Sequence, residues 1–552
     1  MKDLDGIIRG QIKDVISTAL ANAGINYDGE INIETPRDTK FGDFSANTAM
    51  LLAKQEKQAP RMIAQKIIDN MSIDGTYIDR IEIAGAGFIN FYLKEGWMAG
   101  VLPIVEEMGD NYGYTDFGKN EKVMIEFVSA NPTGPMHMGN ARGGALGDSL
   151  GNVMKMAGFD VTKEFYLNDA GNQIEKFSKS LEARYLQQYD AQYPFPEDGY
   201  HGDDIKQRAA QFTEIHGDKY KDATSDERRK ALADFSLEKN SADMKETLKH
   251  YRVVHDVWYC ESDLYKSGDV EKTIQALKDS GEAYEKDGAV WLKGEEKDEV
   301  LVRANGIPTY FAADIAYHYN KFVTRGFDRV INIWGADHHG HIARMKNAMG
   351  LLGIDPERLQ VVTMQLVRLM RGGEVARQSK RTGGAITLTE LIDDIGIDAS
   401  RYFFNMRLAG SHFDFDLDLA VQQSNENPVY YVQYAHARIC SIIRQMVEEG
   451  IKVPACKDID LSLLDKPEEI ELLRKIAQFP GEIKQSAEAL EPAKIVKYVS
   501  DLAGLFHSFY NANRVKVDDN ALMLARLKLI DSVRITIKNA LAILAVEAPE
   551  KM

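Results

Sequence analysis

The stretch that most constrains the fold is residues 121–176, which reads as strand, helix and strand in close succession. V-M-I-E-F-V (123–128) is a short apolar run with the length of a buried strand, and D-V-T-K-E-F-Y-L (160–167) is a second. Between them, apolar residues recur at three- and four-residue spacing from Met138 until a glycine ends the pattern. Consecutive strands joined by a helix pair in parallel. We therefore expect an α/β fold built on a Rossmann-like parallel sheet.

The same rhythm resumes later, where F-D-R-V-I-N-I-W-G (327–335) and L-Q-V-V-T-M-Q-L-V (359–367) read as further buried strands. The stretch between is charge-rich with helical periodicity, and the end of the chain shows only helical apolar stripes. The expected units are an α+β N-terminal domain (1–115), the parallel-sheet domain (121–176 and 301–375), a helical insertion (177–300), a basic loop with a connector (376–425) and an all-α C-terminal bundle (426–552).

Composition narrows the broad class of protein. The chain has 552 residues, of which 44% are hydrophobic and 27% charged, as is typical of a soluble protein of several domains. No apolar run approaches the roughly 20 residues that a membrane-spanning helix needs, and the start lacks a signal-peptide core. We expect a cytoplasmic protein without membrane contact. Cys260, Cys440 and Cys456 are far apart and odd in number, which predicts buried thiols and neither a disulfide frame nor a zinc knuckle.

The formal net charge of −17 by itself argues against a nucleic-acid partner. Nucleic-acid binding, however, depends on local basic surface and not on the total charge. Acidic residues can lie far from a basic groove, so RNA stays among the candidate partners.

The first motif is S-A-N-P-T-G-P-M-H-M-G-N (129–140), where the first strand meets the helix. A helix start offers free backbone N–H groups and the positive end of the helix dipole, which together bind phosphate. Gly139 would let a flat ring approach the backbone closely, and His137 could donate to a phosphate oxygen. The alternative is a capped helix with a buried histidine and no ligand.

The second motif is A-R-Q-S-K-R-T-G (376–383), a cationic loop bounded by glycine. Its Arg377, Ser379, Lys380 and Arg381 could stabilise a triphosphate during group transfer if the loop lay beside a nucleotide site. Standing alone, the motif is equally typical of a solvated basic loop.

Together the two motifs resemble the signature pair of class I aminoacyl-tRNA synthetases. Longer blocks narrow the resemblance to the arginyl-tRNA synthetase family: E-F-V-S-A-N-P-T-G-P-M-H-M-G-N, F-Y-L-N-D-A-G-N-Q, I-N-I-W-G-A-D-H-H-G-H, N-P-V-Y-Y-V-Q-Y-A-H-A-R and the terminal A-P-E-K-M. K-F-G-D-F-S-A-N is similar to that family's extra N-terminal domain. The resemblance spans nearly the whole chain apart from residues 177–300.

The resemblance implies an activity and its partners. ATP with Mg²⁺ would activate L-arginine to arginyl-adenylate, and the arginyl group would pass to the 3′ end of tRNA(Arg) for protein synthesis. It also implies an anticodon-binding C-terminal bundle, a monomer, no zinc, and a first step that requires tRNA. Two alternatives remain: another class I ligase or adenylyltransferase, and a catalytically silent tRNA-binding relative.

The resemblance also implies site residues around the two signatures. Its catalytic set is His137, Asn140, Arg377, Ser379 and Lys380. Its ATP-binding set is His137, Gly139, Asn140, Asp337, His338 and Lys380. The sequence departs from the family pattern at Asn140, where histidine is usual, and at Arg377 and Gln378, where lysine and methionine are usual.

For arginine, planar carboxylate partners suit a guanidinium. Glu126 and Asp314 are the acids in suitable blocks, and Tyr310 lies one helical turn before Asp314. The implied arginine-binding set is Glu126, Asn131, Tyr310, Asp314 and His338. An acid on a buried strand such as Glu126 has few purely structural explanations.

The implied tRNA-binding residues are Asn47, Tyr430 and Tyr434. The two tyrosines fall on one helix face, where they could stack on bases or simply pack within the bundle. The cluster D-H-H-G-H (337–341) invites a zinc interpretation, with Cys260 as a loose further ligand. The resemblance instead places the cluster at the adenosine and arginine site.

Overall fold

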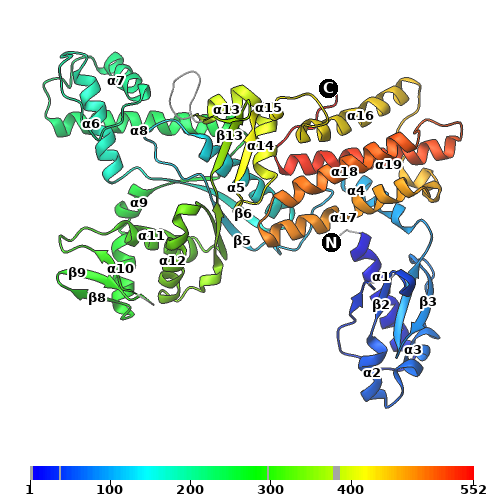
Figure 1. Ribbon diagram of the computed structural model, residues 1–552. Coiled ribbons are helices and arrows are strands. Elements are labelled where there is room, and N and C mark those ends of the chain that lie inside the picture. The colour runs from blue at the N-terminus through cyan, green and yellow to red at the C-terminus, as the bar shows by residue number, and fades with distance from the viewer. Residues whose placement is uncertain (1–3, 37–38, 295–296, 377–385) are drawn as a thin grey trace.

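The computed structural model describes residues 4–36, 39–294, 297–376 and 386–552 of the chain. Figure 1 shows a central sheet with a helical bundle on one side and two smaller lobes on the other. The N-terminal domain, in blue, projects from beneath the bundle.

The central sheet has five strands in the order β12-β11-β5-β6-β7, and every neighbouring pair is parallel. Its strands are β5 (Lys122–Glu126), β6 (Asp160–Leu167), β7 (Val257–Cys260), β11 (Arg329–Gly335) and β12 (Leu359–Met364). Helix α5 (Met138–Met156) connects β5 to β6. Val123, Met124 and Ile125 in the middle strand are completely buried, as expected for a parallel sheet covered on both faces. The predicted fold class is confirmed.

The segment 177–300 is mostly helical, as predicted, but it also contains strands that the sequence did not indicate. Its first part is helical: α6 (Asn172–Leu186), α7 (Asp203–His216) and α8 (Ser225–His250). Strand β7 then joins the edge of the parallel sheet beside β6. The remainder is a mixed lobe with α9 (Glu261–Lys266), α10 (Asp269–Asp279) and the antiparallel strands β8 (Ala283–Lys286), β9 (Ala289–Leu292) and β10 (Glu299–Val302). A four-residue strand is too short to show a period, so only tertiary pairing placed β7.

One predicted strand is divided between two sheets. The apolar run 359–367 contains β12, which ends at Met364, and the start of β13 (Val367–Arg371). β13 lies between β14 (Glu374–Val375) and β15 (Phe413–Asp416) in a separate sheet. Hydrophobic periodicity does not show a change of sheet, because both pieces are apolar.

The N-terminal domain is α+β, as predicted. Helices α1 (Leu4–Asn22), α2 (Thr48–Glu56) and α3 (Pro60–Ile68) pack with an antiparallel sheet in the order β1-β2-β4-β3. Its strands are β1 (Ile33–Glu34), β2 (Phe44–Ala46), β3 (Ile78–Ala84) and β4 (Phe88–Leu93). Helix α4 (Val101–Met108) leads from this domain toward the central sheet and packs on the bundle.

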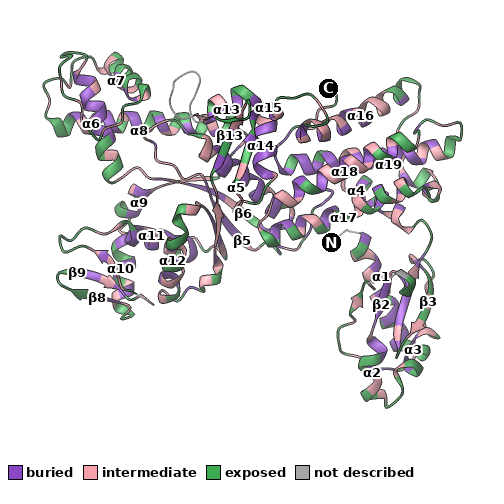
Figure 2. Cartoon of the chain, in the orientation of Figure 1, coloured by how far each residue is buried: buried purple, intermediate pink, exposed green. Residues whose placement is uncertain are grey.

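The C-terminal region is helical, as predicted. Its long helices are α16 (Pro428–Glu448), α17 (Pro467–Ala489), α18 (Ala493–Ala512) and α19 (Asn520–Ile543). Figure 2 shows buried residues on the faces where these helices meet. The connector to the sheet domain contains α13 (Leu388–Ile395), α14 (Ile397–Asn405) and α15 (Leu417–Ala420), while α11 (Tyr310–Tyr319) and α12 (His339–Leu351) flank β11. Within the described ranges, no helix has both the length and the apolar character needed to span a bilayer.

Candidate active site

Several residues singled out from the sequence gather at the carboxyl edge of the central sheet. Strand β5 ends at Glu126, and the neighbouring β11 ends at Gly335, just before Asp337 and His338. Asn332 of β11 pairs in register with Glu126, so the loops that follow the two strands start side by side. In open parallel sheets, ligands bind in the crevice outside the carboxyl ends of the strands.

The start of α5 is fixed by two reciprocal hydrogen bonds. His137 is the N-cap residue, and its backbone N–H donates to Asn140 Oδ1 at 3.0 Å. In return, His137 Nδ1 accepts from the backbone N–H of Gly139 at 3.0 Å. This capping box satisfies amides that the helix start would otherwise leave unpaired. The predicted helix start is confirmed. Asn140, which stands where the family usually has histidine, accepts one of the two capping hydrogen bonds.

Gly139 makes room for the imidazole of His137. A Cβ at Gly139 would lie 2.9 Å from His137 Cε1, so a larger residue would displace the ring. Packing of the surrounding chain desolvates the ring and lowers the pKa of His137. Because Nδ1 of the neutral ring accepts a hydrogen bond, the proton lies on Nε2. The Nε2–H group is then a donor beside the positive end of a 19-residue helix, an arrangement that suits phosphate.

Glu126 already has a cationic partner. Its side chain is 9% exposed, and Oε2 lies 2.6 Å from Nζ of Lys321, which is completely buried. Lys321 belongs to the π-helical turn η4 (Asn320–Thr324) and also donates to Asn332 Oδ1 at 3.3 Å. This ion pair is a structural reason for an acid on a buried strand, which the sequence did not reveal. The charge of Glu126 is therefore compensated before any guanidinium binds, and its expected contact with arginine stays a prediction.

The chain turns sharply after β5. Val128 and Ser129 have φ angles of 70° and 41°, in the left-handed region that a β-branched residue rarely adopts. The turn brings Ser129 Oγ within 2.9 Å of Glu126 Oε1, and the same hydroxyl accepts from the backbone N–H of Tyr166 at 3.2 Å. Both carboxylate oxygens of Glu126 are thus engaged. Such strained backbone is typical of positions that the surrounding structure holds for function.

Asp314 and Tyr310 lie one turn apart on α11, as predicted. Asp314 Oδ2 lies 3.1 Å from Nε2 of His341 on α12, and 39% of the Asp314 side chain is exposed. Tyr310 is exposed, and its hydroxyl accepts from the backbone N–H of Asn172 at 3.4 Å. Asp314 thus reaches the segment that follows β11, and Tyr310 reaches the loop that follows β6.

A further carboxylate belongs to this edge, and sequence analysis missed it. Glu261 directly follows β7 and is almost completely buried. Burial, together with the negative charge of Asp314, raises the pKa of Glu261 to about 7, although a hydrogen bond from Tyr166 favours the ionised form. Two acids that repel each other in a desolvated place favour a bound cation. The only indication in the sequence is that Glu261 directly follows V-W-Y-C. This position points to the sheet edge only if V-W-Y-C is known to be a strand of the sheet.

Asn131, Asp337 and His338 lie in loops around the same edge. The Asn131 side-chain amide donates to Gln173 Oε1 near the start of α6, which adds Gln173 to the site. His338 Nε2 lies 3.6 Å from Asp337 Oδ2, and both side chains are largely exposed. The ring of His338 lies 6.2 Å from that of Trp334. The roles expected of Asn131, Asp337 and His338 stay predictions.

Arg377, Ser379 and Lys380 of the basic loop lie outside the described residues. The chain that follows this loop is attached to the start of α5. The backbone N–H of Met138 donates to the carbonyl oxygen of Ile386 at 3.2 Å, and that of Leu388 donates to the carbonyl oxygen of Met136 at 2.9 Å. Residues that flank the two motifs are therefore hydrogen-bonded neighbours.

Three family models cover most of the chain. Residues 10–93 match "Arginyl tRNA synthetase N terminal domain", residues 106–405 match "tRNA synthetases class I (R), catalytic domain", and residues 432–552 match "DALR anticodon binding domain". The catalytic-domain model alone spans more than half of the chain. The chain belongs to the arginyl-tRNA synthetase family.

Relatives in the arginyl-tRNA synthetase family align along the full length. The arginine–tRNA ligase of Caldanaerobacter subterraneus subsp. tengcongensis is 56% identical, with 98% of both chains covered. That of Ruminiclostridium cellulolyticum is 55% identical, with 100% of both covered. The solved arginyl-tRNA synthetase of Thermus thermophilus is similar in fold, with a TM-score of 0.70 at 21% identity, over 99% of this chain and 100% of that one.

The C-terminal helical bundle carries a cluster of aromatic rings. Tyr430 and Tyr434 of α16 are stacked, with ring centroids 6.1 Å apart and planes 7° apart, so the predicted shared face is confirmed. Arg438 covers both Tyr434 and Tyr510, at 5.0 and 4.5 Å from the ring centroids. His507 of α18 lies 6.0 Å from Tyr434. Sequence analysis missed Tyr510 and His507 because they come from a different helix of the bundle.

Asn47 lies in the N-terminal domain, far along the chain from the sheet edge. It is the N-cap residue of α2, yet its side chain makes no capping hydrogen bond. Among the described residues, its buried Oδ1 has no hydrogen-bond partner. Its expected contact with tRNA stays a prediction.

The metal interpretation of D-H-H-G-H (337–341) gains no support from the parts of the chain that the structure describes. They contain no cluster of three or more His, Cys, Asp or Glu side chains that could hold a metal ion. His341 is engaged with Asp314, and burial raises the pKa of the Cys260 thiol. All three cysteines are free thiols; Cys456 is buried, as predicted, whereas Cys260 and Cys440 are only half-buried.

Proposed function

We infer that this protein is an arginine–tRNA ligase, which uses ATP to activate L-arginine and then transfers the arginyl group to the 3′ end of tRNA(Arg). The observation that carries this inference is the match of residues 106–405 to the class I (R) catalytic domain, at whose sheet edge Glu261 lies beside the negative charge of Asp314. Relatives that match the whole chain at 50–56% identity are named arginine–tRNA ligases.

Asp314 and Glu261 would receive the guanidinium group, with the exposed phenol of Tyr310 beside them. A planar cation with five N–H donors can bind two carboxylates at once, whereas lysine would leave one acid poorly paired. The side chain of Asn131 would hold the amino-acid end of the substrate, and His338 is a further candidate for arginine contact. Glu126, already paired with Lys321, would stabilise the floor of the site.

The helix start at His137 would hold the phosphates of ATP, which arrives with its Mg²⁺ as a substrate complex. Gly139, Asn140, Asp337 and His338 are the remaining expected ATP contacts in the described residues. The carboxylate oxygen of arginine would attack the α-phosphorus, and pyrophosphate would leave. Because both reactants are anionic, positioning and charge neutralisation would dominate the rate.

The basic loop would act on the leaving group. Lys380, with Arg377 and Ser379, is expected to neutralise the developing charge on pyrophosphate. This role is supported by the hydrogen bond that joins Met138, at the helix start, to Ile386, the first described residue after the loop.

In the second step, a ribose hydroxyl of the terminal adenosine would attack the adenylate carbonyl and release AMP. Tyr430 and Tyr434 are expected to stack on unpaired anticodon bases, and Asn47 is expected to contact the tRNA body. A monomer in the cytoplasm remains our proposal.

One experiment tests the proposed function. Purified protein is assayed for amino-acid-dependent pyrophosphate exchange with each of the twenty amino acids, with and without tRNA(Arg), and for formation of arginyl-tRNA. We expect exchange with arginine alone and charged tRNA as the product. Exchange with another amino acid would identify a different class I ligase, and tight tRNA binding without charging would identify a silent relative.

A further inference from the structure

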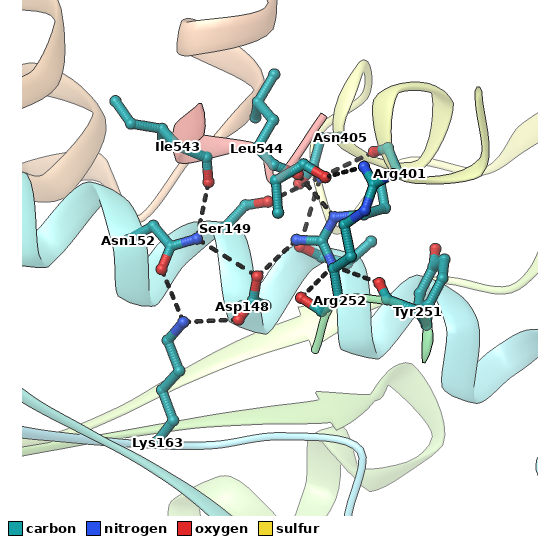
Figure 3. A network of polar contacts seen from close by, with 12 residues as sticks. Asp148, Ser149, Asn152, Lys163, Tyr251, Arg252, Arg401, Asn405, Ile543 and Leu544 are labelled. Atoms are coloured by element: carbon teal, nitrogen blue, oxygen red, sulfur yellow. Dashed lines mark hydrogen bonds and ion pairs between the residues drawn. The ribbon is translucent and has the colours of Figure 1, made fainter. Parts of the chain in front are cut away.

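Arg401 of α14 lies where four segments of the chain meet (Figure 3). Its side chain is completely buried. Nε donates to the carbonyl oxygen of Leu544 at 2.7 Å, and one terminal nitrogen donates to those of Tyr251 and Arg252 at 3.1 and 3.2 Å. The other terminal nitrogen donates to Asp148 Oδ2 at 2.6 Å. One guanidinium therefore joins α5, the end of α8 and the end of α19 to α14.

The charges at this junction are balanced by groups from different elements. Asp148 of α5 also accepts from Nζ of Lys163 on β6, at 2.6 Å. Burial disfavours the carboxylate, but the charges of Arg401 and Lys163 outweigh it and lower the pKa of Asp148. Arg401 and Lys163 together carry one more charge than Asp148 compensates. Carbonyl oxygens at the C-terminal ends of α8 and α19, where the helix dipole is negative, stabilise this excess positive charge.

A second direct contact ties α5 to the bundle. Asn152 of α5 donates to the carbonyl oxygen of Ile543 at 3.0 Å, next to the end of α19. Asn405 at the end of α14 donates to Ser149 Oγ of α5 at 3.1 Å. Three polar residues within one turn of α5, at positions 148, 149 and 152, are thus held by the connector and the bundle.

The same helix begins at His137 and Asn140. Asp148 lies eight residues after Asn140, about two helical turns away within one continuous helix. A helix with a fixed capping box moves largely as a unit. Displacement of the end of α19 would break hydrogen bonds to a buried guanidinium unless α5 and α14 moved with it, and leaving such a charge unpaired is costly.

We propose that Arg401 is a positioning residue, which couples the C-terminal bundle to the helix start that binds ATP. RNA bound on the aromatic face of the bundle would shift the end of α19, and Arg401 would pass that shift to α5. This inference rests on the proposed role of the α5 start in ATP binding.

The chain offers a matched control in Arg526. It is also a buried guanidinium, and its Nε donates to Glu469 Oε1 at 2.7 Å, while a terminal nitrogen donates to the carbonyl oxygen of Arg514. All these partners lie within the C-terminal bundle. Substitution of Arg526 therefore removes a comparable buried contact without touching α5.

The experiment compares the unaltered chain with R401K and R526K. The dissociation constant of ATP is measured by calorimetry with and without a saturating RNA hairpin that carries only the anticodon stem and loop of tRNA(Arg). The hairpin lacks the 3′ end that carries the arginyl group, so it cannot act as the acceptor substrate. We expect the hairpin to tighten ATP binding at least fivefold in the unaltered chain and in R526K, and less than twofold in R401K. Hairpin affinity in R401K should stay within threefold.

Reciprocity gives an internal check, because ATP must tighten hairpin binding by the same factor. The proposal is overturned if the hairpin does not change ATP affinity in the unaltered chain, or if R401K retains the full factor. Should circular dichroism show that R401K is unfolded, D148N removes the charge that joins Arg401 to α5 and leaves Arg401 itself in place, and an unchanged factor in that variant would equally overturn the proposal.

A separate variant distinguishes failure of the coupling from failure of the ATP site. H137A should weaken ATP binding in the absence of RNA. If H137A binds ATP normally, the proposed function of the α5 start is wrong, whatever the result for R401K.

Discussion

Glu126 and the pair Asp314–Glu261 place carboxylates at the same sheet edge in opposite electrostatic states. Glu126 is held between a buried lysine and a serine hydroxyl, so its charge is compensated inside the protein. Glu261 instead lies in a desolvated place beside the charge of Asp314, and its pKa rises to about 7. The charge of the first carboxylate is compensated before a ligand binds. In the second region, a bound cation would favour the ionised form of Glu261, which is what a receptor for a guanidinium requires.

The largest effect is expected when Glu126, the compensated carboxylate, loses its cationic partner. K321M would leave Glu126 buried without its cation, at a cost of about 3–5 kcal/mol in the free energy of unfolding. The double variant E126Q/K321M removes both charges and should recover most of that loss. Urea unfolding of the single and double variants measures this, and equal instability of both would show that the two groups do not form a pair.

A smaller but still large effect is expected at the uncompensated pair. D314N should raise the arginine KM roughly thirtyfold, corresponding to about 2 kcal/mol for a partly exposed carboxylate that pairs with a guanidinium. The ATP KM should stay within twofold. D263N is the control, because Asp263 is a 59% exposed carboxylate two residues after Glu261 and should change the arginine KM by less than threefold. Steady-state pyrophosphate exchange distinguishes the outcomes.

The pH dependence of arginine binding separates the two regions directly. With a pKa of about 7, Glu261 is mainly protonated at pH 6 and mainly ionised at pH 8. Because guanidinium binds the ionised form, affinity for arginine should rise roughly tenfold over this interval. E261Q should abolish the rise, whereas E126Q/K321M should keep it. A rise that persists in E261Q would assign the titration to another group.

The smallest effect is expected at Ser129. S129A removes the hydroxyl that donates to Glu126 Oε1 and should cost about 1 kcal/mol of stability. The pH profile of arginine binding should not change, because Asp314 and Glu261 are untouched. Thermal unfolding measures the first effect and calorimetric titration the second; a shifted pH profile would show that the two regions are not independent.

Local features were predictable because their causes lie within a few residues. The capping box at His137 and Asn140 spans three positions, and the strands and helix of residues 121–176 follow from apolar periodicity. The shared face of Tyr430 and Tyr434 follows from helical spacing alone. Family resemblance extended this knowledge to candidate site residues, but it could not supply their partners.

Sequence alone determined the parallel-sheet fold, the helix start beside it and the helical C-terminal region. It also indicated Glu126 and Asp314 as candidate acids. Only tertiary structure decided that Glu126 pairs with a lysine 195 positions away, that β7 carries Glu261 to the same edge, and that Arg401 joins α5 to the last helix. The physical reason is that periodicity and capping act within one or two turns. The charge state of a carboxylate depends on whatever the fold places within a few ångströms of it.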